Sequence, residues 1–184
     1  LNEAQINMAR FAYETAGRIP YYWGGRTSIR NFTMNEFGKP TKPDTSKHHR
    51  ALRGLDCSGY VAYVYDVIDH NNLGHRGTAT FKSLGTYYTW SHKDKIEVGD
   101  VVWIGRETEN GYSGHVGIYV GNNKVIEEVG NPTNNVIESE LDTSKWYGFI
   151  KINIKNKGQT ITKEDYLNGY RPPTQSLIDT LYAD

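Results

Sequence analysis

The sequence lacks several features that define common classes of protein. A single cysteine among 184 residues excludes an internal disulfide, and with it the small secreted domains that disulfides hold together. No apolar run reaches the length of about 18 residues that a transmembrane helix needs, so we expect no membrane span. The chain has neither a His-Glu-x-x-His motif nor paired cysteines, so we expect no metal and no cofactor.

An excess of charge of one sign is also missing. The 21 basic and 21 acidic residues cancel, which disfavours nucleic acid or an anionic membrane as a partner of the whole molecule. Neither an initiator Met nor a charged-then-apolar leader is found at Leu1, so we expect a trimmed mature domain. We expect this domain to act as a monomer.

The residues that are abundant suit one sheet-rich domain. A chain of 184 residues has the usual size of a single domain with a sizeable core. Tyrosine occurs 14 times, with 4 tryptophans and 19 glycines, which is typical of strands and of a groove lined by aromatic rings with polar tips. We therefore expect a partner that is extended and polar.

Hydrophobic periodicity predicts helices first and strands later. Apolar residues recur at helical spacing over 2–16 and, more regularly, over 57–69. Residues 71–95 are rich in Gly and Thr and predict loops with one short helix. A period of two then predicts strands over 98–104, 115–120, 124–129 and 147–154. Helices followed by a run of antiparallel strands indicate an α+β domain.

Two segments stand apart from this pattern. Residues 26–53 have no sustained period and carry seven basic against two acidic residues, so they predict a long basic insertion loop. Residues 155–184 follow the last predicted strand and form a C-terminal extension. The functional domain is therefore expected over 1–154.

The single cysteine lies in the most informative part of the chain. Cys57 opens the helix predicted over 57–69, and Asp56 is well placed to cap that helix. Free backbone N–H groups and the positive end of the dipole at a helix N-terminus lower the pKa of a thiol, which prepares it as a nucleophile. The alternative is that Cys57 is a small buried side chain, which is the commoner case for a lone cysteine.

A nucleophilic thiol needs a base, and His115 is the histidine that begins a predicted strand. The other five histidines lie in the basic loop or in polar connections, where a solvated side chain is expected. As alternatives, His115 is a core histidine bonded to a carbonyl or an exposed strand residue. Taken with Cys57, it indicates thiol catalysis.

Four blocks of residues stand out along the chain: 20–25 (PYYWGG), 56–61 (DCSGYV), 98–102 (VGDVV) and 115–121 (HVGIYVG). In this order they resemble the signature blocks of the NlpC/P60 family of cell-wall cysteine peptidases. The resemblance extends from the first helix to about residue 154. It implies a papain-like fold in which a cysteine-bearing helix packs on an antiparallel β-sheet that carries the histidine.

The resemblance also implies that Cys57 and His115 cleave stem peptides of bacterial peptidoglycan in a secreted or wall-associated enzyme. The bond cut is commonly the one between D-glutamate, through its γ-carboxyl, and a diamino acid. In the family, the residues that match Tyr21, Asp56 and Ser58 line the site and can hold the free amino end of the substrate. Asp56 offers a charge for an ammonium group, and the other two offer hydroxyls. Plain capping roles for Asp56 and Ser58 stay open.

The third catalytic position departs from the family pattern, which usually has a histidine or a neutral polar residue there. Counting twelve residues from His115 leads to Glu127, whose carboxylate can orient and stabilise the imidazole. A three-residue turn would place Glu127 on the face of His115, whereas a two-residue turn at Asn122 and Asn123 would place Glu128 there. Family spacing favours Glu127, and both glutamates can also be exposed strand residues.

The role of the basic loop and the type of activity also leave alternatives open. Loop 26–53 is much longer than the connection usual in the family, and it could be a lid, a patch for anionic wall polymers or a solvated insertion. A papain-like N-acetylmuramoyl-alanine amidase or an interpeptide-bridge peptidase is the nearest rival among hydrolases. A catalytically inactive cell-wall-binding module and a thiol-dependent transferase are the rivals from other classes.

Overall fold

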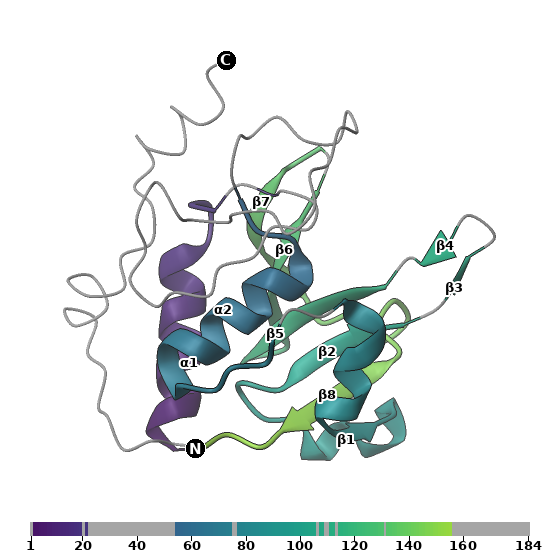
Figure 1. Ribbon diagram of the computed structural model, residues 1–184. Coiled ribbons are helices and arrows are strands. Elements are labelled where there is room, and N and C mark those ends of the chain that lie inside the picture. The colour runs from purple at the N-terminus through teal and green to yellow at the C-terminus, as the bar shows by residue number, and fades with distance from the viewer. Residues whose placement is uncertain are drawn as a thin grey trace.

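The computed structural model describes residues 2–19, 21, 54–74, 77–105, 107–108, 111–112, 114–130 and 132–155. The predicted basic loop over 26–53 lies outside these residues, as does the predicted extension 155–184 apart from its first residue. The described part consists of helices packed on an antiparallel sheet (Figure 1). A cysteine is the first residue of one of these helices. The predicted α+β fold is confirmed.

Both α-helices begin at capped residues. α1 spans Glu3–Thr15 and starts with a capping box, in which the side chains of Asn2 and Gln5 each accept a hydrogen bond from the other's backbone N–H. α2 spans Cys57–Asp69, and Asp56 is its N-cap. Each end of both helices lies within one residue of the prediction. No helix in the described ranges is long and apolar enough to cross a membrane.

Six strands form the main sheet in the order β1-β8-β2-β5-β6-β7, and all neighbours are antiparallel. They are β1 Gly85–Tyr88, β2 Val101–Ile104, β5 His115–Gly121, β6 Lys124–Val129, β7 Asn135–Glu140 and β8 Gly148–Ile152. A separate hairpin of β3 Glu107–Thr108 and β4 Gly111–Tyr112 projects from the ends of β2 and β5 (Figure 1). Two 3-10 helices, η1 Thr78–Leu84 and η2 Trp90–Lys95, flank β1.

The four predicted strands are present as β2, β5, β6 and β8, whereas the sequence does not predict β1 and β7. The expectation of loops with one short helix over 71–95 is wrong in part, because this stretch contains two 3-10 helices and β1. β1 and β7 are the edge strands of the sheet, and most of their side chains are exposed or half-buried. An edge strand buries little on either face, so its sequence carries little hydrophobic periodicity.

α1 and α2 cover one face of the sheet, and their apolar sides form the larger core (Figure 1). Val61 and Val64 of α2 are fully buried with Val116 and Ile118 of β5. A second cluster around Trp146 covers the opposite face. Because full burial of one such aliphatic side chain stabilises a fold by roughly 1.5–3 kcal/mol, this packing fixes α2 firmly against β5 and β6.

Candidate active site

Cys57 is the first residue of α2, and its neighbours fix the start of the helix. The Asp56 side chain accepts hydrogen bonds from the Gly59 N–H at 2.7 Å and from Ser58 Oγ at 2.9 Å. Asp56 therefore caps α2, satisfying one of the N–H groups that a helix start leaves without intrahelical partners. Cys57 stands at the positive end of the helix dipole with 8% of its surface exposed.

Tyr21 reaches the same end of α2 through the backbone. It forms an isolated parallel bridge with Leu55, two residues before Cys57. Its ring lies over Gly130 at the end of β6, where an added Cβ would come within 3.6 Å of the ring. The structure thus places Tyr21 beside the segment that leads into Cys57.

His115 opens β5, and its imidazole contacts Glu127 on the neighbouring strand β6. The distance from His115 Nε2 to Glu127 Oε1 is 2.9 Å, and the Glu127 side chain is 2% exposed. Ser139 Oγ donates to Glu127 Oε2 at 2.5 Å, and Lys145 Nζ lies 3.4 Å from Glu127 Oε1. The Trp146 ring stacks on the imidazole, with centroids 5.3 Å apart and an interplanar angle of 19°. Imidazole and carboxylate are therefore each held from more than one side.

Sequence reasoning misses Ser139, Lys145 and Trp146 as members of this site. Ser139 arrives through β7, where it pairs with Val125 of β6. Lys145 and Trp146 come from the connection between β7 and β8. These contacts depend on long-range pairing, and no local motif marks the three residues in advance.

The turn between β5 and β6 has two residues. Asn122 and Asn123 have positive φ values of 50° and 59°, a conformation that tight hairpin turns require and asparagine tolerates. The residues on either side of the turn pair directly. By the alternation of strand side chains alone, such a turn would place Glu128 on the face of His115.

A β-bulge reverses that outcome. The register shifts within 119–121, so β5 has one residue more than β6 over this stretch. Beyond the bulge Ile118 pairs with Ile126, and this register brings Glu127 to His115. The expectation that Glu127 needs a three-residue turn is therefore wrong, because a two-residue turn and a bulge together produce the same contact.

His115 and Glu127 shift each other's ionisation. Burial acts to lower the pKa of His115, but the charge of Cys57, a hydrogen bond with its side chain and the Glu127 carboxylate raise this pKa to about 9. Burial acts to raise the pKa of Glu127, but the hydrogen bond and charge of His115, with Ser139 and Lys145, lower it to about 2. At neutral pH the imidazole is protonated and the carboxylate ionised. Because Nε2 faces Glu127, Nδ1 is the ring nitrogen left for Cys57.

The structure thus brings together the three side chains predicted for catalysis. Cys57 supplies a thiol at a helix N-terminus, His115 a protonated imidazole hydrogen-bonded to it, and Glu127 a carboxylate that orients the imidazole. This arrangement can perform nucleophilic attack followed by proton transfer. Within the described part of the chain, no group of three or more His, Cys, Asp or Glu side chains is placed to hold a metal ion.

Glu128 lies on the other face of β6, toward the helices. Its side chain is fully buried. Burial, followed by the negative charges of Asp56 and Cys57, raises the pKa of Glu128 well above its usual value. The alternative of an exposed strand residue is therefore wrong for Glu128, and also for the buried Glu127.

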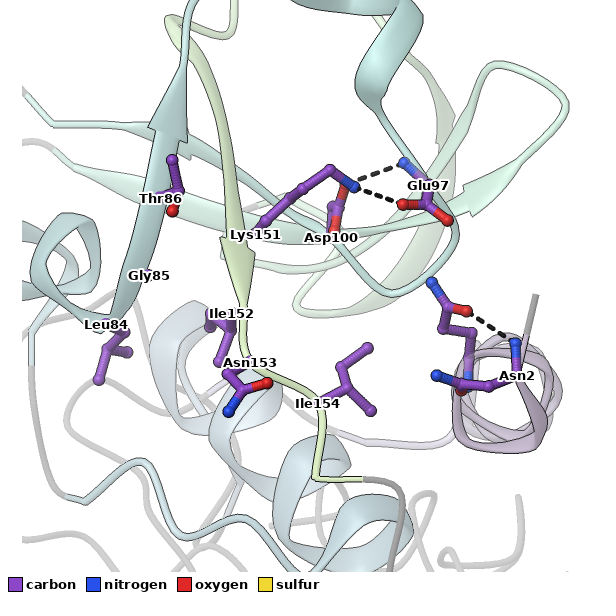
Figure 2. A pocket seen from close by; sticks show the side chains of 11 residues that line it. Asn2, Leu84, Gly85, Thr86, Glu97, Asp100, Lys151, Ile152, Asn153 and Ile154 are labelled. Atoms are coloured by element: carbon purple, nitrogen blue, oxygen red, sulfur yellow. Dashed lines mark hydrogen bonds and ion pairs between the residues drawn. The ribbon is translucent and has the colours of Figure 1, made fainter.

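A pocket of about 430 Å³ (Figure 2) lies at the end of the sheet opposite to His115. Its lining includes Gln5 of α1, Thr86 of β1 and Lys151 of β8. It contains neither Cys57 nor His115, so it is separate from the candidate active site.

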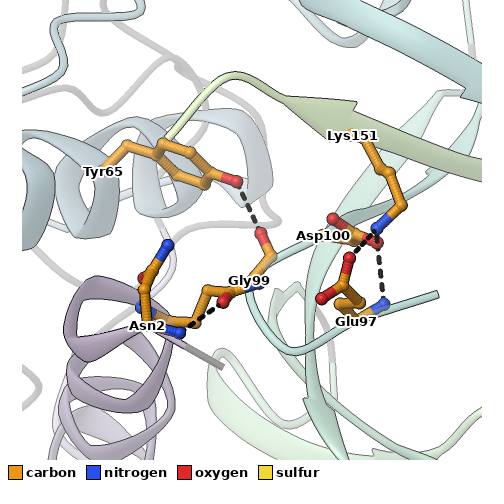
Figure 3. A network of polar contacts seen from close by, with 7 residues as sticks. Asn2, Tyr65, Glu97, Gly99, Asp100 and Lys151 are labelled. Atoms are coloured by element: carbon orange, nitrogen blue, oxygen red, sulfur yellow. Dashed lines mark hydrogen bonds and ion pairs between the residues drawn. The ribbon is translucent and has the colours of Figure 1, made fainter. Parts of the chain in front are cut away.

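Lys151 in this pocket fixes the turn that precedes β2 (Figure 3). Its Nζ lies 2.9 Å from Glu97 Oε1 and 2.9 Å from Asp100 Oδ2, and Asp100 also accepts the Glu97 N–H at 2.8 Å. Burial raises the pKa of Asp100 to about 6, against the opposing effect of Lys151. Gly99 has a φ of 96°, which glycine adopts without strain. These contacts give the block over 98–102 a structural role.

Comparison with known proteins gives a match to one family model. The model of the NlpC/P60 family matches residues 17–154, which is most of the chain. No curated protein matches the sequence.

Several solved structures share the fold. The NlpC/p60 domain of the peptidoglycan hydrolase SagA is 24% identical, with a TM-score of 0.53 over 83% of this chain and 100% of that chain. The P60 domain of antigen MAP1272c from M. avium paratuberculosis is 18% identical, with a TM-score of 0.57 over 81% and 93% of the two chains. RipD from Mycobacterium tuberculosis, described as non-catalytic and adapted to peptidoglycan binding, is 17% identical, with a TM-score of 0.57 over 83% and 99%. At these identities the likeness concerns the fold.

Proposed function

The chain belongs to the NlpC/P60 family, and from this premise we propose that it is a cysteine peptidase that hydrolyses stem peptides of bacterial peptidoglycan. The observation that carries the proposal is the position of His115 between Cys57 and Glu127, beside the N-terminus of α2. A protonated imidazole hydrogen-bonded to a cysteine side chain is the resting arrangement that thiol catalysis needs.

The reaction follows from these three side chains. The Cys57 thiolate attacks the scissile carbonyl carbon, and backbone N–H groups at the start of α2 stabilise the negative oxygen of the tetrahedral intermediate. His115 gives its proton to the leaving amine, which departs as the thioester forms. His115 then takes a proton from water, whose oxygen attacks the thioester and releases the acid. Glu127 keeps the imidazole in place through both steps.

For the substrate, we propose the bond between D-glutamate, through its γ-carboxyl, and a diamino acid. Tyr21, Asp56 and Ser58 lie at or near the start of α2, where they would hold the free amino end of the stem peptide. An ammonium group pairs favourably with the Asp56 carboxylate, and hydroxyls accept its remaining hydrogen bonds. A secreted or wall-associated location follows from such a substrate, and wall-polymer binding by loop 26–53 stays a prediction.

Digestion of purified peptidoglycan tests the proposal. We expect wild-type protein to release fragments with a new amino terminus on the diamino acid, identified by mass spectrometry, and Cys57→Ala to release none. Fragments with an intact stem would indicate the amidase, and cleavage within the bridge would indicate the interpeptide-bridge peptidase.

A second arm separates hydrolysis from binding alone, the role described for RipD. Both proteins are sedimented with the same walls. Binding by both wild type and Cys57→Ala, with no fragments released by either, would replace the peptidase with a wall-binding module.

A further inference from the structure

Glu128 is the most unusual side chain near the proposed site. It is 0% exposed, and neither of its carboxyl oxygens has a hydrogen-bond partner among the residues that the structure describes. Leaving a buried polar group without a partner costs about 1–3 kcal/mol, and more for a charged group. A glutamate that only fills space would be replaced at this position by an apolar residue with a gain in stability, so Glu128 calls for a functional explanation.

The surroundings of Glu128 indicate what that function is. At the start of α2, Glu128 interacts electrostatically with the negative charges of Asp56 and Cys57 and with Tyr60. The Tyr60 hydroxyl is hydrogen-bonded to the Thr15 hydroxyl of α1 at 2.7 Å. On β7 its direct partner is the apolar residue Val136. Among the residues that the structure describes, the groups that act on Glu128 are therefore negative or neutral, and its carboxyl holds its proton.

We propose that Glu128 is a specificity-determining residue, a second carboxyl group behind Asp56 that makes the α2 N-terminus selective for substrates with a free ammonium group. The inference rests on the proposed function, in which Asp56 holds the amino end of the stem peptide. Burial keeps Glu128 protonated together with the negative charges of Asp56 and Cys57, and a cation at Asp56 offsets the contribution of those charges. Glu128 then releases its proton to solvent, and the resulting carboxylate strengthens the hold on the ammonium group.

Substrate selectivity gives the first test. Wild type, Glu128→Gln and the exposed control Glu140→Gln are compared on a soluble stem peptide with a free amino terminus and on its N-acetylated form. We expect Glu128→Gln to lower the preference for the free amine about tenfold through KM, with little change in kcat, because a nearby buried charge is lost. Glu140→Gln should keep the wild-type preference. An unchanged preference in Glu128→Gln would overturn the inference.

Proton release gives the second test, because a purely structural glutamate would release none. Binding of the free-amine peptide to Cys57→Ala and to the double variant Cys57→Ala, Glu128→Gln is measured by calorimetry at pH 6 in two buffers of different ionisation enthalpy. We expect a buffer-dependent heat of proton release in the first protein that is absent in the second. The titration of the peptide's own amine is common to both, so equal heats would contradict a role for Glu128.

The two tests separate failure of this inference from failure of the proposed function. If wild type hydrolyses peptidoglycan but Glu128→Gln keeps the amine preference, the inference about Glu128 is wrong and the peptidase stands. If wild type hydrolyses nothing but Cys57→Ala binds the free-amine peptide with proton release that depends on Glu128, the peptidase is wrong and the inference stands.

Discussion

At the scale of single residues, Glu127 has contacts suited to holding an imidazolium. One of its oxygens faces His115 and Lys145, and the other accepts the Ser139 hydroxyl. These partners keep the carboxylate ionised although it is buried, which is why its pKa lies at about 2. A group with this environment can stabilise positive charge on His115 throughout a catalytic cycle.

The first residue-scale prediction is that Glu127→Gln lowers turnover roughly 10- to 100-fold, because a hydrogen bond to a charged partner contributes about 1.5–3 kcal/mol. Glu127→Ala should lower it further, because it also removes the acceptor. The protonated form of His115 is lost as pH rises through its pKa, about 9 in the wild type. Without the carboxylate this alkaline limit should move to lower pH, which the pH dependence of kcat/KM will measure.

The control for the Glu127 variants is Glu140→Gln, which changes an exposed glutamate and should retain full activity. Circular dichroism of each variant separates a catalytic defect from misfolding. Full activity and an unchanged pH profile in Glu127→Ala would show that some other group orients His115.

Some site residues can be predicted from the sequence and others cannot. Cys57 and Asp56 are predictable because a helix start is a local feature of the chain. The pairing of His115 with Glu127 follows from family spacing, whereas strand alternation leads to Glu127 or Glu128 according to the length of the turn. The bulge that decides between them leaves no strong signal in the sequence. Trp146 is not predictable, because its contact with His115 depends on where β8 joins the sheet.

At the scale of elements, the start of α2 has two roles that use the same residue. Asp56 caps the helix through the Gly59 N–H, and the same carboxylate supplies the negative charge that we propose for binding the substrate amine. Capping needs only an acceptor oxygen, whereas pairing with an ammonium group needs the charge. The two roles can therefore be separated by substitution.

The element-scale prediction is that Asp56→Asn keeps the stability of α2 but raises KM for the free-amine peptide about tenfold. Asp56→Ala should also lower the free energy of unfolding by about 1 kcal/mol, because the cap is lost. Urea unfolding measures the stability, and steady-state kinetics measure KM. Equal KM values for wild type and Asp56→Asn would reduce Asp56 to a capping residue.

The elements themselves differ in how far the sequence predicts them. α2 is predictable because its apolar residues recur at helical spacing, and the inner strands β2, β5 and β6 are predictable because they are short, mostly buried runs rich in β-branched residues. β7 carries three polar residues in its last four and follows an asparagine-rich turn, so its sequence reads as a connection. Its position is set by pairing with β6, which is a property of the assembled sheet.

At the scale of the whole molecule, the site forms where two layers meet. The helix layer brings Cys57 and the sheet brings His115 and Glu127, so neither layer holds the site alone. Glu128 belongs to the same junction, because it is buried between β6 and α2 near Asp56 and Cys57. Its buried proton makes the stability of the entire fold depend on pH.

The whole-molecule prediction follows from the sign of that dependence. The pKa of Glu128 is raised in the folded state, so above the ordinary glutamate pKa of 4.5 the folded chain holds a proton that the unfolded chain has lost. The free energy of unfolding therefore falls as pH rises, by about 1.4 kcal/mol per pH unit for one such group. Asp100, raised to about 6, adds to the fall only up to that pH.

Glu128→Gln removes this ionisation and keeps the size of the side chain. As pH rises we expect wild type to lose stability faster than Glu128→Gln, by up to about 1.4 kcal/mol per pH unit while Glu128 stays protonated in the folded chain. Urea unfolding at a series of pH values gives both curves, and Glu140→Gln should follow the wild-type curve. Parallel curves for wild type and Glu128→Gln would mean that Glu128 is ionised in the folded state. A buried ion of this kind would need a cation beside it, and the charge balance at the α2 N-terminus would then be the reverse of the one proposed.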